Sequence, residues 1–361
     1  MSAASDALGG LLAGEVQRGA MPGAVWWVGG PEGPIATGSY GHAAVEPAPA
    51  PLTMDTPFDL ASLTKPLATA LLAILLDRDR RLSLDASLGS VFPELQSSPF
   101  GRASLRDAAA HRAGFPAWAP LYLAGTSREA YVAAIAAATP HGQGGEALYS
   151  DLGYVLFGFA LERAAGATLD QLFAERIARP LGLERCAFAG TGPAFRDAAA
   201  TERRRSYEQA MAGSGERCDH IWADVPRGQV HDGNAWGLGG VAGHAGLFGN
   251  AAAVVAVAMA LLAPGRLGLA QDDLVPMFRP VAARTGARTV GFMRAEDSDS
   301  VRGVLPDDAV GHWGFTGTSL WIDAARRRVY VFLTNRVHPQ VPQEPFTATR
   351  RAFHLAASAL P

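Results

Sequence analysis

The order of strand-like and helix-like segments constrains the fold of this 361-residue chain more than any other feature. Short apolar segments with strand character occur near both ends of the chain, and the middle shows apolar residues at the helical period of about 3.6. This order predicts an α+β protein whose antiparallel sheet takes strands from both chain ends, with flanking helices. The expected strands are 24–28, 35–40, 290–293, 309–313, 319–323 and 329–334.

The same periodicity predicts a mainly helical insertion between the two groups of strands. We expect a sheet domain built from 1–75 and 225–361, a helical domain at 76–224, and an active site in the cleft between them. The expected helices are 2–19, 62–76, 105–112, 128–138, 151–165, 168–178, 250–262, 271–279 and 345–359.

Charge and cysteine content exclude several classes of protein. With 31 basic and 34 acidic residues the net charge is −3, so no basic field attracts nucleic acid or anionic lipid. Cys186 and Cys218 form no CxxC pair, which argues against a disulfide framework or thiolate metal site. No run of about 18 apolar residues and no signal-like N-terminus occur, so we expect a cytoplasmic protein without a membrane span, or a periplasmic or secreted one if a signal was removed.

The chain contains thirty arginines and one lysine, Lys65. Arginine stays protonated in proteins, whereas a buried lysine loses its proton readily and can act as a base. Ser62 precedes Lys65 by three residues, so both side chains lie on one face of the predicted helix. A serine hydroxyl next to a neutral amine is an activated nucleophile. The alternative is a helix N-cap serine followed by a surface lysine.

Two further segments carry candidate catalytic groups. Tyr149 and Asp151 stand directly before a predicted helix, where a tyrosine can relay a proton. The alternative is a packed aromatic side chain with Asp151 as the N-cap. The glycine-rich segment 311–319 allows a substrate to approach the backbone at Gly314, with main-chain N–H groups as oxyanion donors. A glycine-rich hairpin explains this segment equally well.

Ser62-x-x-Lys65, Tyr149-x-Asp151 and His312-x-Gly314 resemble, in order and spacing, the three motifs of the penicillin-recognising serine hydrolases. The chain is most similar to the class C β-lactamase-related branch, which includes DD-carboxypeptidases and family VIII esterases. This resemblance implies a β-lactamase/transpeptidase-like fold and cofactor-free hydrolysis of an ester, amide or peptide bond through an acyl-enzyme. The similar blocks are 58–69, 111–116, 149–153, 230–249, 311–323 and 333–339.

The resemblance also implies roles for individual residues. Ser62 is the expected nucleophile, Lys65 its base or proton relay, and Tyr149 a second general base that protonates the leaving group. The backbone N–H groups of Ser62 and Phe315 are the expected oxyanion hole. The remaining predicted site residues are Asp151 and His312 in the catalytic set and Trp313, Gly314 and Thr316 in substrate binding.

The chain departs from the family pattern at two motifs. Asp151 replaces the usual asparagine, and its negative charge favours an ion pair with Lys65 that raises the pKa of the amine. His312 and Trp313 replace the Lys-Thr pair that helps to hold a substrate carboxylate in β-lactamases. Esters or short amides are therefore favoured over β-lactams as small-molecule or short-peptide substrates.

Other functions remain open from the sequence. A DD-carboxypeptidase or weak β-lactamase is one alternative, and a non-catalytic penicillin-binding or ligand-sensing protein with a locked Lys65–Asp151 pair is another. The segment 237–242 matches the G-x-G-x-x-A motif of dinucleotide-binding proteins, but no predicted strand precedes it. A metal site is a further hypothesis, although the sequence contains no HExxH motif. Its candidate ligands are Asp219, His220, Asp224, His231, Asp232 and His244.

Overall fold

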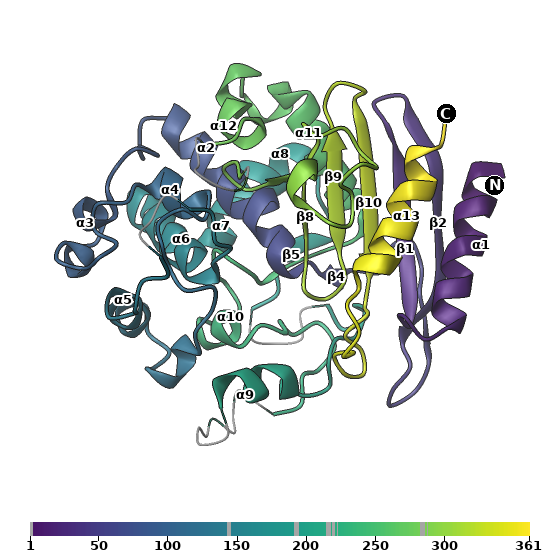
Figure 1. Ribbon diagram of the computed structural model, residues 1–361, viewed down its shortest axis with the longest axis horizontal. Coiled ribbons are helices and arrows are strands. Elements are labelled where there is room, and N and C mark those ends of the chain that lie inside the picture. The colour runs from purple at the N-terminus through teal and green to yellow at the C-terminus, as the bar shows by residue number, and fades with distance from the viewer. Residues whose placement is uncertain are drawn as a thin grey trace.

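An antiparallel sheet joins the two ends of the chain in the computed structural model, which describes residues 3–142, 146–190, 195–213, 218, 221, 223–281, 286 and 288–361 (Figure 1). Among these residues the strand order is β3-β2-β1-β10-β9-β8-β7, so N-terminal β1 pairs with C-terminal β10. The predicted sheet from both chain ends is confirmed. Its strands are β1 (Gly23–Gly30), β2 (Gly33–Ala44), β3 (Ala50–Pro51), β7 (Met293–Arg294), β8 (Val310–Trp313), β9 (Ser319–Asp323) and β10 (Arg328–Thr334).

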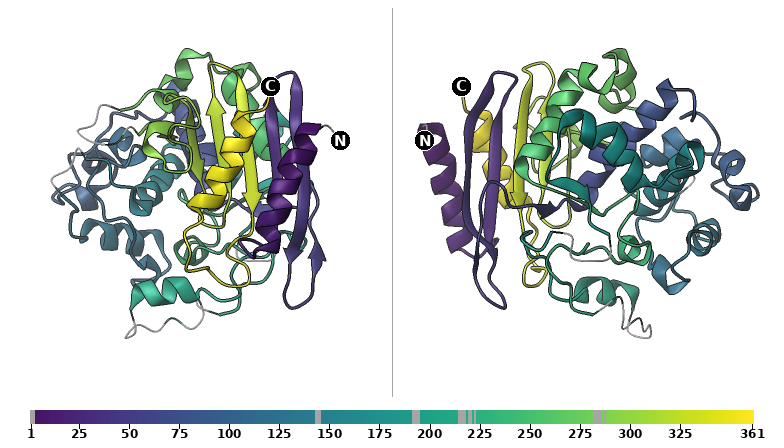
Figure 2. Two further views of the ribbon diagram at one scale, coloured as in Figure 1. Left: turned by 45° about the vertical axis from the view of Figure 1, so that its right-hand side comes forward. Right: turned by 180° about the vertical axis from the view of Figure 1, so that it is seen from behind.

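Helices from the two ends of the chain, α1 (Ala3–Gln17) and α13 (Thr347–Ser358), cover one face of this sheet (Figures 1 and 2). Leu8 and Leu12 of α1 and Phe353 of α13 belong to one buried cluster with Trp26 of β1 and Phe332 of β10. Side chains alternate between the faces of a strand, so the neighbours of Trp26 in β1 point to the opposite face. Both faces of β1 are therefore covered by apolar packing.

The other face of the sheet carries α11 (Ala251–Leu262), and the helical part of the chain lies beyond it (Figure 2). None of the helices in the described part of the chain is long and apolar enough to cross a membrane. The remaining α-helices are α2 (Leu71–Arg78), α3 (Leu88–Val91), α4 (Leu105–Ala109), α5 (Arg128–Ala136), α6 (Asp151–Ala165), α7 (Leu169–Phe173), α8 (Arg179–Leu181), α9 (Ser206–Ala212), α10 (Gly233–Gly237) and α12 (Val275–Phe278). The 3₁₀ and π segments are η1 (Ala61–Leu63), η2 (Lys65–Ala70), η3 (Pro93–Leu95), η4 (Leu121–Leu123), η5 (Ala174–Ala178), η6 (Pro264–Leu267), η7 (Asp272–Leu274) and η8 (Ala295–Asp297). The division into two domains at 75 and 225 stays a prediction.

The predicted continuous helix over 62–76 is wrong, because the chain forms three successive helical segments there. A 3₁₀ turn, η1, is followed by the π-helical η2 and then by α2. Pro66 lacks a backbone N–H and cannot donate an α-helical hydrogen bond. Ala61 has a positive φ of 46°, and its N–H donates to Asp59 Oδ1 at 2.9 Å. Irregular helical turns of this kind frequently mark functional sites.

A small second sheet, β4-β6-β5, escaped the sequence analysis because its strands are too short to show a period of two. It places β4 (Phe58–Asp59) and β5 (Cys186–Phe188) on either side of β6 (Leu247–Gly249). The segment 58–59 leads directly into η1, so β6 fixes the start of the helical run that carries Ser62.

The predicted strand at 290–293 is also wrong. Thr289 and Phe292 close a turn in which the N–H of Thr289 donates to the carbonyl of Phe292 at 2.9 Å. Gly291 within this turn has a φ of 103°, outside the extended region. Only Met293 and Arg294 pair with β8.

Three other predicted helices are shorter or irregular. The helix expected at 168–178 passes from α7 into the π-helical η5. The helix expected at 105–112 ends at Ala109, because His111 adopts a positive φ of 58°. The helix expected at 271–279 is divided between η7 and α12, with Pro276 in the first turn of α12.

We expect Gly158→Ala to destabilise the protein, because a Cβ at Gly158 would lie 2.9 Å from the backbone of Gly243. Overpacking of this kind costs about 1–3 kcal/mol. Gly10→Ala in α1 meets nothing within 4 Å and should instead stabilise by about 0.5–1 kcal/mol. Urea unfolding of both variants measures the two effects, and equal unfolding free energies would contradict the close contact between α6 and the 243–244 backbone.

Candidate active site

Three polar side chains meet at the beginning of the irregular helical run. Ser62 Oγ lies 2.9 Å from Lys65 Nζ and 2.6 Å from Tyr149 Oη. Ser62 belongs to η1, Lys65 opens η2 one turn later, and Tyr149 comes from the loop before α6. The structure therefore brings together the first two sequence motifs around one hydroxyl group.

The Lys65 side chain is fully buried and has two further partners. Its Nζ donates to the carbonyl of His244 at 3.0 Å and lies 2.7 Å from Asp151 Oδ1. Burial lowers the pKa of Lys65, because an ammonium loses hydration in the interior, while the charge of Asp151 raises it. Burial outweighs the carboxylate, so the pKa of Lys65 lies below its ordinary value.

Ser150, rather than Asp151, caps α6. The Ser150 Oγ accepts the N–H of Gly153, whereas Asp151 is the first residue of the helix. The alternative role of Asp151 as an N-cap is therefore wrong. A carboxylate in a first helical turn is favoured by the helix dipole, and this one also faces Lys65.

Burial raises the pKa of Tyr149 well above its ordinary value, and the charge of Asp151 raises it further. The hydrogen bond with Ser62 and the charge of Arg288 act in the opposite direction without cancelling these effects. Tyr149 is thus a phenol at neutral pH and can donate a proton.

The two histidines near Tyr149 are neutral at physiological pH. Burial holds the pKa of His312 and of His111 well below the ordinary value, and the charge of Lys65 adds to the effect at both rings. His312 Nδ1 lies 2.9 Å from the Trp313 carbonyl, which makes it the donor, and its buried Nε2 has no partner among the described residues. His111 Nδ1 accepts the N–H of Ser150 at 3.0 Å. The His312 position therefore supplies no positive charge.

The glycine-rich segment after β8 is tied to the strand that precedes Ser62. Thr316 Oγ1 donates to the Asp59 carbonyl at 2.7 Å, and Thr318 Oγ1 donates to the Leu60 carbonyl at 3.1 Å. A Cβ at Gly314 would lie 2.6 Å from the Leu60 carbonyl oxygen, so only glycine fits. The N–H of Phe315 donates no hydrogen bond within the described ranges. This leaves Phe315 available as an oxyanion donor beside Ser62.

A cavity of about 220 Å³ opens beside Ser62. Of the predicted site residues, Ser62, Tyr149, Asp151, Trp313 and Phe315 line it. The other four predicted residues lie behind the wall: Lys65, His312, Gly314 and Thr316. The complete lining is Asp59, Ala61, Ser62, Ala117, Trp118, Tyr149, Asp151, Tyr207, Glu208, Met211, His231, Asp232, Ala245, Trp313 and Phe315.

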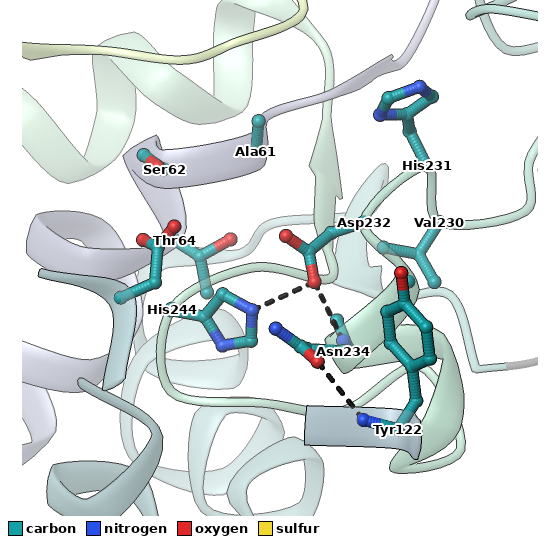
Figure 3. A network of polar contacts seen from close by, with 12 residues as sticks. Ala61, Ser62, Thr64, Tyr122, Val230, His231, Asp232, Asn234 and His244 are labelled. Atoms are coloured by element: carbon teal, nitrogen blue, oxygen red, sulfur yellow. Dashed lines mark hydrogen bonds and ion pairs between the residues drawn. The ribbon is translucent and has the colours of Figure 1, made fainter. Parts of the chain in front are cut away.

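A polar network that the sequence analysis did not assign supports this cavity (Figure 3). Asp232 Oδ1 lies 2.8 Å from His244 Nε2 and accepts the N–H of Ala235 at 2.7 Å, which caps α10. His244 is the residue whose carbonyl holds Lys65. Asp59 accepts the N–H groups of Ala61 and His231 at 2.9 and 2.8 Å. An aspartate directly before a short helical turn signals a cap, but no sequence signal places Asp232 in a cavity.

The hypothetical metal ligands do not converge in the described part of the chain, which contains no cluster of three suitable side chains. His231 Nε2 lies 2.9 Å from Glu202, and His244 is held by Asp232. Asp219 and His220 lie outside the described residues.

The Beta-lactamase family model matches residues 9–353. A putative D-alanyl-D-alanine carboxypeptidase of Escherichia coli (strain K12) is 30% identical over 331 residues, which cover 85% of this chain and 75% of the relative.

Solved structures show the same fold. A class C beta lactamase from Rhodobacter sphaeroides superposes with a TM-score of 0.74 at 20% identity and covers 98% of both chains. EstCE1, described as a hydrolase with promiscuous acyltransferase activity, superposes with a TM-score of 0.70 at 18% identity, again over 98% of both chains.

Proposed function

Because the chain belongs to the beta-lactamase family of serine hydrolases, we propose that it cleaves an ester or amide bond through an acyl-enzyme on Ser62. The observation that carries this proposal is the position of Ser62 Oγ, 2.9 Å from the buried amine of Lys65 and 2.6 Å from Tyr149. A serine hydroxyl becomes a nucleophile when a neighbouring base removes its proton. Both partners lie within proton-transfer distance.

In the acylation step, neutral Lys65 takes the Ser62 proton as Oγ bonds to the scissile carbonyl carbon. The carbonyl oxygen becomes an oxyanion and accepts the N–H groups of Ser62 and Phe315. The bond to the leaving group then breaks, and Tyr149, whose pKa is raised by burial, donates a proton to that group. The phenolate recovers its proton from the Lys65 ammonium, so the proton of Ser62 is transferred to the leaving group.

In the deacylation step, a water molecule attacks the Ser62 ester, and Lys65 with Tyr149 accepts its proton. The tetrahedral intermediate uses the same two N–H groups. When the bond between Ser62 Oγ and the acyl carbon breaks, the proton returns to Oγ and the acid is released.

The ion pair between Lys65 and Asp151 bears on the alternative of an inert binding protein. At 2.7 Å the carboxylate favours the ammonium form of Lys65. Burial acts more strongly in the opposite direction, and the pKa of Lys65 stays lowered. This balance supports an enzyme whose base can lose its proton more readily than an ordinary lysine, rather than a permanently locked pair.

The charges around the cavity favour substrates without a carboxylate next to the scissile bond. None of the described residues that line the cavity is a lysine or arginine. His312, at the position where the related β-lactamases have lysine, is neutral because burial lowers its pKa. Esters and short amides therefore suit the cavity better than β-lactams. The second candidate activity is cleavage of D-alanyl-D-alanine peptides, because the Escherichia coli relative is named a putative D-alanyl-D-alanine carboxypeptidase.

The proposed substrate is a small molecule or short peptide, in keeping with a cavity of about 220 Å³. The cytoplasmic location expected from the sequence stays a prediction, and cell fractionation tests it.

We expect Ser62→Ala to lower turnover of a 4-nitrophenyl ester by about 10³-fold or more, because the nucleophile is lost. Intact-mass measurement after treatment with a fluorophosphonate should show one adduct on the parent protein and none on Ser62→Ala. Ser127→Ala, at the exposed N-terminus of α5, removes a hydroxyl that does not line the cavity and should retain both properties.

Retention of parental turnover by Ser62→Ala on esters, a cephalosporin and a D-Ala-D-Ala peptide alike would refute the mechanism. Preferential turnover of the D-Ala-D-Ala peptide over its C-terminal amide and over esters would favour the carboxypeptidase alternative.

We expect Asp151→Asn to shift the pH profile of kcat/KM. A base must be deprotonated, so activity rises as pH rises through the pKa of that base. The charge of Asp151 raises the pKa of both Lys65 and Tyr149, so its removal lowers both values. The rising limb should move to lower pH in Asp151→Asn. An unchanged limb, or one moved to higher pH, would show that neither residue is the base.

A further inference from the structure

Four carboxyl side chains line the cavity beside Ser62, and two of them are engaged by groups next to the proposed nucleophile. Asp59 accepts backbone N–H groups at both of its oxygens, from Ala61 at 2.9 Å and from His231 at 2.8 Å. Asp151 forms the 2.7 Å ion pair with Lys65. The other two, Asp232 and Glu208, retain unused acceptor capacity.

Only one carboxylate oxygen of Asp232 forms hydrogen bonds with the described part of the protein. Its Oδ1 is taken by His244 Nε2 and the N–H of Ala235, whereas Oδ2 accepts no hydrogen bond within the described part of the chain. Figure 3 shows the second oxygen pointing away from both partners. Burial disfavours ionisation, but the His244 ring holds the pKa of Asp232 below its ordinary value. The side chain is 21% exposed, so a charged oxygen faces the cavity.

Glu208 carries the second unused oxygen. It lies in α9, is only 5% exposed, and its Oε1 accepts the N–H of Gly233 at 2.9 Å. Its Oε2 is buried and has no hydrogen-bond partner among the residues that the structure describes. A Cβ at position 233 would collide with this oxygen, so the glycine leaves room for the carboxyl group. Burial raises the pKa of Glu208 to about 8, and the charge of Asp232 contributes to the rise.

The protein supplies no cation to this pair from the cavity wall. No lysine or arginine occurs among the described lining residues. The buried Arg205 is close enough to act on Glu208, but its guanidinium donates to the backbone carbonyls of His231, Ile221 and Val230. A buried carboxyl beside a second carboxylate is costly unless a proton or a cation accompanies it.

We propose that this cavity binds a substrate with an ammonium group, which Asp232 and Glu208 hold through Oδ2 and Oε2. An ammonium has three donors and no acceptor, which matches two unpaired carboxyl oxygens.

Under the acyl-enzyme mechanism proposed above, on which this assignment rests, the ammonium belongs to the acyl portion of the substrate. Tyr149, the proton donor to the leaving group, packs against the rings of His312 and Trp313, with centroids 5.8 and 6.5 Å away. Glu208 and Asp232 belong to a different part of the cavity wall from these rings, because they come from α9 and from the N-terminus of α10. The preferred substrate class is therefore an ester or amide of an amino acid with a free amine.

The test compares two isosteric ligands in the Ser62→Ala background, where no turnover interferes. D-alanine 4-nitroanilide carries an ammonium at pH 7, since α-amines have a pKa of about 7.7–8.0. Isobutyric acid 4-nitroanilide has a methyl group in its place. Titration calorimetry should show the ammonium ligand binding about tenfold or more tightly, the scale of a hydrogen bond to a charged group.

Adding Asp232→Asn or Glu208→Gln to Ser62→Ala should reduce this preference to about threefold or less, since one of the two carboxyl partners of the ammonium is lost. Asp224→Asn removes an equal charge at a 64% exposed site paired with Arg204 and should leave the preference unchanged. If Asp232→Asn fails to fold because it caps α10, Glu208→Gln decides the question.

Equal binding of the two ligands, absence of binding by both, or a preference that survives both substitutions would overturn the inference. Failure of the proposed function has a different signature, namely no fluorophosphonate adduct and no ester turnover by the parent protein. An ester hydrolase without ammonium preference would retain the proposed function and exclude the ammonium site.

Discussion

The interaction on which the rest of the site depends is the burial of one amine. Lys65 is fully buried, and its Nζ contacts Ser62 Oγ, the His244 carbonyl and the Asp151 carboxylate. Loss of hydration favours the neutral amine, whereas the carboxylate favours the ammonium. A lysine at the surface would stay protonated and could not take the proton of Ser62 at neutral pH. Burial thus supplies the base, and Asp151 limits how far the pKa falls.

The fold keeps this amine in place by joining distant parts of the chain. The pairing of β1 with β10 unites the two ends, and Thr316 and Thr318 attach the turn after β8 to the backbone before Ser62. On the opposite side, Gly158 of α6 allows the 243–244 backbone to approach closely enough for His244 to reach Lys65. The same network continues through Asp232 into the cavity, so proton transfer and substrate binding share one scaffold.

Local patterns were sufficient to predict the sheet from both chain ends and the pairing of Ser62 with Lys65, whereas the approach of Tyr149 to this pair was implied by the resemblance to the penicillin-recognising serine hydrolases. The spacing of a serine and the sole lysine has a direct chemical meaning, and the strand order constrains which segments can be neighbours. Glu208 and Asp232 escaped prediction because their role depends on which carboxyl oxygens remain unpaired after folding, and no local pattern encodes this. Thr316 was expected at the substrate, yet its hydroxyl donates to Asp59. The π-helical turn after Lys65 and the turn at 289–292 likewise result from tertiary contacts that override local periodicity.

Since Lys65 is the sole lysine of the chain, labelling with [15Nζ]lysine places one side-chain nitrogen signal in the whole protein. Its titration by NMR measures the pKa of the proposed base without reference to any substrate. A pKa clearly below the ordinary lysine value of about 10.4 is expected, because burial outweighs the charge of Asp151. A pKa at or above that value would show a permanently protonated amine and contradict the role of Lys65 as the base.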